Sequence, residues 1–211
     1  MKKIFFLLIP FLFLSCLPQI SIRSENNDEI TLFFSTGFSQ NTAKILKSMS
    51  GIDSETPLFN KNDVLELLKN AGATNTSANI PSSTEVAASG SLQNLSQNSL
   101  YKIGILSTTK NSLKFTIGPK QIAAFYELLN EDSKSYLDLM MIPALIGEKM
   151  TVDEYKDLLS SMYGPTFAEE IVSGSLSINL SSKNGKKSVK HTISLGELLT
   201  ATEEKSWEIT F

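Results

Sequence analysis

One stretch near the C-terminus decides the fold class: Ser175-Leu-Ser-Ile-Asn-Leu-Ser-Ser-Lys-Asn-Gly-Lys-Lys-Ser-Val-Lys-His-Thr-Ile-Ser194. On both sides of its Asn184-Gly185 dipeptide, apolar residues alternate with polar ones, and this period of two is typical of strands with one covered face. Asn-Gly favours a two-residue turn. A hairpin closed there pairs position 183 with position 186 and places these residues opposite each other: Leu180 and Val189, Ile178 and His191, Leu176 and Ile193.

Outside this hairpin, the sequence predicts both strands and helices. Strands are expected over 30–35 and 206–211, and a second hairpin over 101–105 and 113–117. Helices are expected after Ser39 or Asn41, from Asn62 to Gly72, after Gly118-Pro119, from Ser133 to Pro143, after Thr151, after Gly164-Pro165 and, as one turn, over 195–200. The clearest helix start is the capping box Thr151-Val-Asp-Glu154. The helix from Ser133 is apolar almost all round, which predicts burial on several sides.

These elements predict an α+β fold, with an antiparallel sheet of about five to six strands packed against a cluster of helices. We expect residues 1–15 to be a signal peptide, 16–28 a lipidated tether, and 29–211 a single α+β domain. Residues 74–99 hold seven Ser, three Thr and four Asn with a single charge at Glu85. This composition predicts a long Ser/Asn-rich loop.

The N-terminus has the three parts of an export signal. Lys2 and Lys3 precede an apolar run over 4–14, which is too short to cross a bilayer, and Ser15 stands directly before Cys16. Residues 1–16 resemble a bacterial lipoprotein signal, in a loosened form similar to those of spirochaete lipoproteins, because the positions before the cysteine hold Phe13, Leu14 and Ser15. The resemblance implies that Cys16 is acylated and becomes the mature N-terminus. An ordinary cleaved signal and an uncleaved anchor remain the alternatives.

Charge and composition narrow the classes of partner. Without residues 1–15 the chain has 17 basic and 22 acidic residues, a net charge of −5, which disfavours nonspecific nucleic-acid binding. Arg23 is the sole arginine and lies in the expected tether. A domain without arginine is a poor candidate for phosphorylated ligands, because bidentate gripping of phosphate is what arginine does best.

Few residues could carry chemistry. His191, the single histidine, is expected on the apolar side of its strand, as a half-buried residue or, alternatively, as a general base. Ser181 and Ser194 are close to it but are expected on the opposite face of the hairpin. No clustered Cys and His residues suggest a zinc site, and we predict no metal and no cofactor.

Three further features have a functional and a structural interpretation. Asp138 is the only charge between Tyr136 and Ile146, so it is either a buried acid with a raised pKa or an ordinary surface carboxylate. The lysines at the hairpin end either meet an anionic surface or keep a strand edge soluble; they are Lys183, Lys186, Lys187 and Lys190. The pair Met140-Met141 is expected in the core, with an adaptable binding surface as the alternative.

The function hypothesis that follows is a membrane-tethered, non-enzymatic interaction or binding module of the cell envelope. It is expected to be exported, lipid-anchored through Cys16 on the periplasmic or outer-surface side, and to bind an envelope or extracellular protein rather than nucleic acid. One alternative is a carrier of an apolar ligand such as lipid, which needs an enclosed apolar cavity. Another is a carboxylate-based envelope hydrolase, which needs two convergent acids in a cleft.

Overall fold

The structure, a computed structural model, describes residues 18–26, 28–49, 51, 53–129 and 131–211. Expectations about the signal peptide and Cys16 fall outside the described residues. The strands are β1 Gln19–Asn26, β2 Glu29–Gly37, β3 Ala73–Ser82, β4 Glu85–Gln93, β5 Leu106–Thr108, β6 Ser112–Ile117, β7 Ser175–Ser181, β8 Ser188–Ser194 and β9 Lys205–Thr210. The helices are α1 Gln40–Met49, α2 Lys61–Asn70, α3 Ser99–Lys102, α4 Pro119–Tyr126, α5 Glu131–Leu139, α6 Pro143–Ile146, α7 Val152–Tyr163, α8 Pro165–Ser173 and α9 Leu195–Leu199, with short 3₁₀ turns at Leu95–Gln97 and Lys183–Gly185.

The strands form two sheets, which confirms the α+β class and corrects the predicted sheet. Six strands pair in the order β3-β4-β2-β1-β7-β8, and three others in the order β5-β6-β9. The large sheet is mixed rather than purely antiparallel, because β1 and β7 run parallel while its other neighbours are antiparallel. Parallel neighbours require a long connection, and here the chain builds most of the molecule between them.

The C-terminal hairpin has the predicted register. Leu180 lies opposite Val189, Ile178 opposite His191, and Leu176 opposite Ile193. The strands end at Ser181 and Ser188, and the Ser182 amide donates to the Lys187 carbonyl at 2.9 Å. A 3₁₀ turn over Lys183–Gly185 closes the loop, with Gly185 at a φ of 64° that favours glycine.

The expected tether over 16–28 is wrong for most of its length, because residues 19–26 form β1 in the middle of the large sheet. Ile22 is 1% exposed, whereas its neighbours Ser21 and Arg23 point to the other face, so the strand alternates although its outer side chains are polar. Arg23 therefore belongs to the folded domain. The argument against phosphorylated ligands, which assumed a domain without arginine, was wrong on this point.

The expected loop over 74–99 is also wrong, because most of it forms the hairpin of β3 and β4. Small residues conceal the alternation: Val86, Ala88, Gly90 and Leu92 are buried, while the three residues between them are half-buried. Gly90 stands where a Cβ would meet the Ala73 Cβ at 2.9 Å, so the close approach of the two strands requires glycine.

Two shorter segments also differ from expectation. Residues 99–102 form α3 rather than a strand, because the Asn98 side chain caps this turn by accepting from the Leu100 amide at 2.9 Å. The helix expected from Ser133 to Pro143 ends at Leu139, and α6 begins at Pro143. Proline forces the preceding residue out of the helical region, and Ile142 accordingly has a ψ of 114°.

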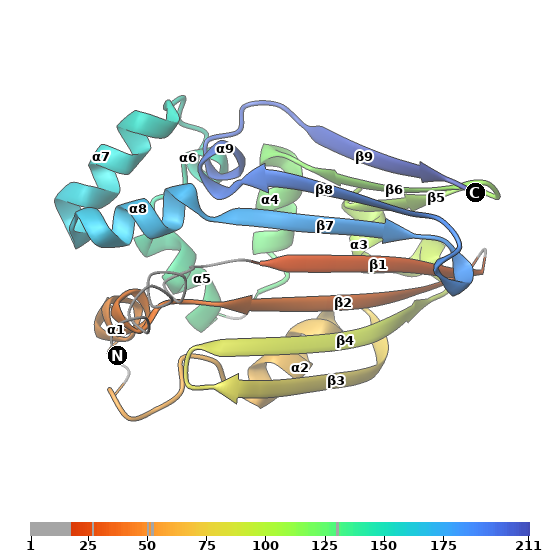
Figure 1. The fold of residues 1–211 in the computed structure, drawn as a ribbon, viewed down its shortest axis with the longest axis horizontal. Helices are drawn as coiled ribbons and strands as arrows, with labels where there is room; N and C mark the ends of the chain where they lie inside the picture. Colours follow the sequence, from red (N-terminus) through yellow and green to blue (C-terminus); the bar gives the residue numbers. More distant parts are fainter. Residues whose placement is uncertain (1–17, 27, 50, 52, 130) are drawn as a thin grey trace, which may run out of the picture.

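Two apolar clusters fill the interior. One lies between the large sheet, the second sheet and helices α2 to α4, with Ile30, Leu92 and Ile178 fully buried. The other joins α1 to helices α5 to α8 around Tyr155 and Phe167, and the predicted Thr151–Glu154 capping box starts α7 beside it. Figure 1 shows helices α2, α3 and α4 and the second sheet behind the large sheet, whose other face turns to the viewer uncovered.

Candidate functional site

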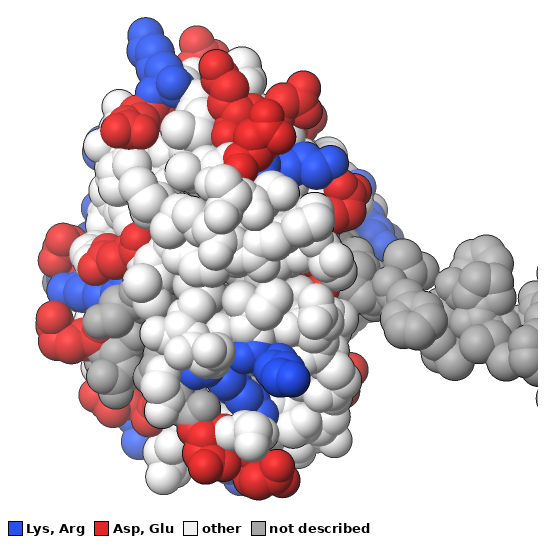
Figure 2. Space-filling view, turned by 90° about the vertical axis from the view of Figure 1, so that its left-hand side faces the viewer, with Lys and Arg blue, Asp and Glu red and all other residues white. Residues whose placement is uncertain are grey.

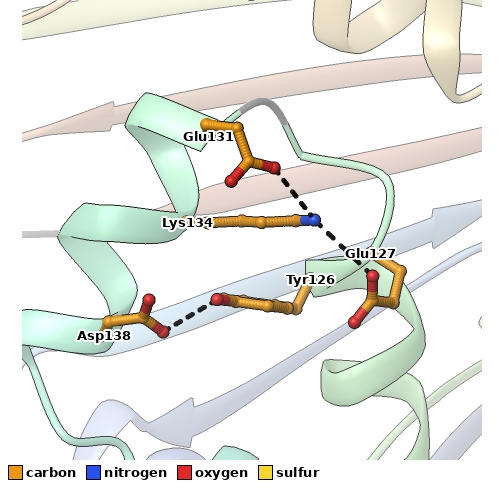
Figure 3. Close-up of polar contacts among 5 residues, drawn as sticks. All are labelled: Tyr126, Glu127, Glu131, Lys134 and Asp138. Atoms are coloured by element: carbon orange, nitrogen blue, oxygen red, sulfur yellow. Dashed lines mark hydrogen bonds and ion pairs between the residues drawn. The ribbon is translucent and has the colours of Figure 1, made fainter.

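Asp138 lies in a polar cluster on the surface formed by α4, α5 and the loop between them (Figure 3). Tyr126, at the end of α4, donates its hydroxyl hydrogen to Asp138 Oδ1 at 2.8 Å. Lys134 Nζ lies 3.5 Å from Glu127 Oε2 and 3.4 Å from Glu131 Oε1. The same Nζ is 5.4 Å from the centroid of the Tyr126 ring, a distance at which the ring face attracts a cation.

These contacts shift the pKa values of Tyr126 and Lys134. The hydrogen bond to the Asp138 carboxylate raises the pKa of the Tyr126 phenol, because removing its proton would place two negative charges side by side. Partial desolvation lowers the pKa of the Lys134 ammonium. The hydrogen bond to Glu131 and the charge of Glu127 outweigh that effect, so its pKa is raised.

The polar cluster gives little support to acid catalysis. Asp138 is exposed, which agrees with the surface interpretation rather than with a buried acid. Figure 3 shows Glu127 and Glu131 turned toward Lys134, while Asp138 lies by the Tyr126 hydroxyl, so the three acids do not converge.

Four large apolar side chains on α5, α6, α7 and the turn between α5 and α6 are exposed. We call this set the apolar turn, and its members, with their exposed fractions, are Leu139 (37%), Met141 (39%), Ile146 (49%) and Met162 (45%). Met140, between two of them, is buried, so the methionine pair divides between core and surface. Two tyrosines of α7 fix the turn from below: Tyr163 donates to the Leu139 carbonyl at 2.7 Å, and Tyr155 to the Met140 carbonyl at 2.9 Å.

The backbone of the apolar turn is strained. Met141 has a φ of 45°, which is uncommon for a residue other than glycine, asparagine or aspartate. Such strain is held by the surrounding structure, here the hydrogen bonds from Tyr155 and Tyr163. Figure 2 shows a broad area without charges on this helical end of the molecule, with charged residues of both signs above and below it.

His191 is half-buried on β8, opposite Ile178, as the structural interpretation predicted. Its ring packs against Trp207 of the second sheet at a centroid distance of 6.0 Å. Ser194 caps α9 by accepting from the Glu197 amide at 3.1 Å. The contacts of His191 are therefore those of a residue at the seam between the two sheets.

The four lysines of the hairpin end are all exposed. Lys187 Nζ donates to the Thr210 carbonyl at 3.3 Å, which joins the turn to the end of β9. The hydrogen bond from Arg23 is the main cause that holds the pKa of Glu25 below its usual range, and the positive charge of Lys183 adds to the effect. Lys187 thus has a structural contact, and Lys183 acts on Glu25 through its charge.

The uncovered side of the large sheet, which we call the open face, carries mainly uncharged polar side chains. Its central members are Gln19, Ser21, Arg23, Thr31, Phe33, Ser35, Ser89, Ser91, Ser177, Asn179, Lys190 and Thr192. Phe33 is the exception, an aromatic ring that is 44% exposed between Ser21 and Ser89. The sequence does not predict this surface, because β1 falls in the expected tether and β4 in the expected loop. The alternation of Ile20 and Ile22 with polar residues is the available signal.

Among the depressions on the described part of the molecule, two are lined largely by polar residues. One of about 320 Å³ lies on the open face between β1, β7 and β8, where Ser21, Asn179 and Lys190 line it. The other, of about 380 Å³, lies beside α9, and Glu197, Thr200 and Lys205 are among its lining residues. Neither has the enclosed apolar lining that a lipid carrier needs.

Within the described ranges, no group of three or more His, Cys, Asp or Glu residues could hold a metal ion. Over the same residues, no helix is both long and apolar enough to cross a bilayer. Comparison of the chain with protein-family models, with curated proteins and with solved structures finds no match. Function is therefore argued from the surfaces themselves.

Proposed function

We propose that this protein is an exported, lipid-anchored, non-enzymatic binding module of a bacterial cell envelope. The apolar run before Cys16 supports export, and Cys16 has no other cysteine in the chain to pair with. A cysteine that cannot form a disulfide within its chain, directly after an export signal, is a candidate for acylation. Because each buried methylene contributes about 0.8 kcal/mol to membrane binding, more than one acyl chain at Cys16 would hold the domain stably at the membrane.

The observation that carries the binding role is the apolar turn. Its four members are large apolar side chains exposed to solvent, and two tyrosines hold the strained backbone at Leu139–Met141. Exposed apolar side chains that gather in one patch mark sites of interaction, and the proposal is that these four act as such a patch. Methionine side chains adapt to partners of different shape, and the apolar turn contains two of them. The partner that fits is an envelope or extracellular protein with an apolar surface of its own.

Acylation is tested first. The protein is expressed in a bacterium with an alkyne-labelled fatty acid, and the membrane fraction is analysed by in-gel fluorescence and intact mass. We expect a chain that begins at Cys16 and carries acyl groups, and an unlabelled Cys16→Ser variant. A wild-type chain that is unlabelled and cleaved elsewhere would remove the lipid anchor from the proposal.

Binding is tested by site-specific photo-crosslinking in intact cells. A photoreactive residue is placed at Met162 in the apolar turn and, as the matched control, at Lys110 in the exposed turn between β5 and β6. We expect one discrete adduct from position 162, identified by mass spectrometry, that disappears when Met141 is also changed to Asp. Identical adducts from both positions, or none from 162 in an acylated protein, would contradict a binding role for this surface.

A further inference from the structure

The observed start of β1 leaves almost no tether. Only Leu17 and Pro18 separate Cys16 from Gln19, the first residue of the strand. Pro18 is itself fixed, because its carbonyl accepts a hydrogen bond from the Ser177 amide at 2.9 Å. Three residue steps span at most about 11 Å, so an acyl group on Cys16 must lie close to this end of the sheet.

The surroundings of β1 limit the direction in which the chain can leave. Helix α1 follows β2 on one side of β1, and α8 precedes β7 on the other side. Glu170 of α8 joins the two helices: it accepts from the Ser39 amide at 2.8 Å and from the Ser39 hydroxyl at 2.5 Å, and also from the Thr42 hydroxyl. Behind the sheet lies the packed interior. Of the two faces of the sheet at this end, only the open face is uncovered (Figure 1), so a chain that turns onto the sheet turns toward it.

We infer that the open face of the large sheet lies against the phospholipid surface of the membrane that holds the acylated Cys16, with Phe33 at the interface. The inference rests on the proposed lipid anchor. Phe33 pairs with Ser21, only two residues along β1 from Gln19, so the ring lies within reach of any bilayer that holds Cys16. Phenylalanine is one of the side chains by which interfacial segments bury apolar area at the boundary between headgroups and acyl chains.

The polar residues of the open face suit the same contact. Hydroxyl and amide groups exchange hydrogen bonds with headgroup oxygens and with the water between them. The acidic residues of this face, Glu25, Glu29 and Glu85, stand at or next to strand ends, whereas Lys190 is a cation in the cross-strand row that contains Phe33 and Ser21. A surface without acidic groups at its centre meets anionic lipid without repulsion. The apolar turn belongs to the helices, so it stays available to a protein partner.

The single cysteine makes a direct test possible. When Cys16 is acylated, a new cysteine is the only free thiol, so Phe33→Cys can be labelled with an environment-sensitive fluorophore. Lys110→Cys, in the second sheet's turn, is the matched control, and Ser21→Cys is a second open-face position. The acylated, full-length mature proteins are reconstituted into vesicles of phosphatidylethanolamine and phosphatidylglycerol. Quenching of the fluorophore by iodide reports its exposure to water. Quenching by brominated lipids, included in a second set of vesicles, reports its contact with the bilayer.

At positions 33 and 21 we expect iodide quenching to fall several-fold on reconstitution and bromolipid quenching to appear, with neither change at 110. Intact mass of the same samples reports acylation separately. Equal iodide quenching at 33 and 110 in acylated protein overturns this inference and leaves the lipid anchor standing. A mature chain without acyl groups overturns the anchor and, with it, the inference.

Discussion

The two faces of the large sheet carry opposite kinds of side chain on the same strands. On β7, Leu176, Ile178 and Leu180 are almost completely buried, whereas the alternate residues, such as Ser177 and Asn179, remain partly exposed on the open face. The covered face holds the sheet to the second sheet and to the helices. The open face makes no such contact, so its side chains are free to serve a surface role. The covered face thus stabilises the fold, and the open face is the proposed membrane contact.

The largest expected loss of stability comes from a substitution on the covered face. Ile178→Ala removes a fully buried side chain, and we expect the free energy of unfolding to fall by about 2–5 kcal/mol through lost burial and the cavity left behind. Urea unfolding followed by the fluorescence of Trp207, the only tryptophan, measures the change.

The matched control for Ile178→Ala is its neighbour Ser177→Ala, which points to the open face. We expect that substitution to change the free energy of unfolding by less than about 0.5 kcal/mol. Equal losses at both positions would show that the two faces contribute alike and that the open face is covered in solution.

The next effect concerns the end of the sheet, where α1 and α8 meet. Glu170→Ala removes the carboxylate that receives the Ser39 amide and the hydroxyls of Ser39 and Thr42. Because hydrogen bonds to charged groups contribute more than neutral ones and Thr42 is fully buried, we expect a loss of about 1–3 kcal/mol in urea unfolding.

Glu169→Ala provides the comparison within the same helix turn. Glu169 forms an exposed ion pair with Lys156, with the Nζ and Oε2 atoms 2.5 Å apart, and such pairs contribute little. The loss should stay below about 0.5 kcal/mol. If Glu169→Ala were the more damaging change, the closure of the strand end by α1 and α8 would have to be rejected.

The success and failure of the sequence predictions follow the same division of faces. The hairpin of β7 and β8 was predicted with its register because large apolar residues alternate on both sides of a short turn. In β4 the covered face holds Ala88 and Gly90, and such small residues conceal the alternation. The parallel pairing of β1 with β7 depends on contacts between distant segments, which local pattern does not report.

The candidate site was predictable only in part. Asp138 stood out in the sequence as a lone charge, but Tyr126, its hydrogen-bond partner, comes from another helix whose orientation depends on packing. The apolar turn was foreseen as core, because an apolar helix without a polar face normally is buried. Pro143 ends that helix early, and the break exposes Leu139 and Met141.

Substitutions at two adjacent phenylalanines compare the two faces of the sheet directly, with a smaller expected effect on stability. Phe33 lies on the open face and Phe34 on the covered face, where it pairs with Ile20 and Ala88. We expect Phe33→Ser to change the free energy of unfolding by no more than about 0.5 kcal/mol. Phe34→Ser should lower it by more than about 1 kcal/mol, because it removes apolar area from the covered side. A large loss from Phe33→Ser in the absence of membrane would assign that ring to folding rather than to the bilayer contact.

The smallest expected effect on stability comes from the polar cluster of Figure 3, which lies on neither face of the sheet. It shows how little a contact between two surface side chains contributes to stability. Asp138→Asn removes the negative charge that accepts the Tyr126 hydroxyl, so we expect the pKa of Tyr126 to fall toward its ordinary value and stability at neutral pH to fall only slightly, because the pair is exposed. NMR titration of the tyrosine ring carbons measures this pKa.

The sign of the pH dependence follows from the raised pKa of Tyr126. A phenol whose pKa is higher in the folded than in the unfolded chain stabilises the fold below about pH 10, the ordinary value, and this contribution is lost as pH rises through the folded pKa. Alkaline destabilisation should therefore be less steep in Asp138→Asn than in the wild type. Glu66→Gln, an exposed carboxylate on α2, is the control and should leave the alkaline slope unchanged. If Asp138→Asn left the Tyr126 pKa where it was, the hydrogen bond would not persist in solution, and Asp138 would be free to contact a partner.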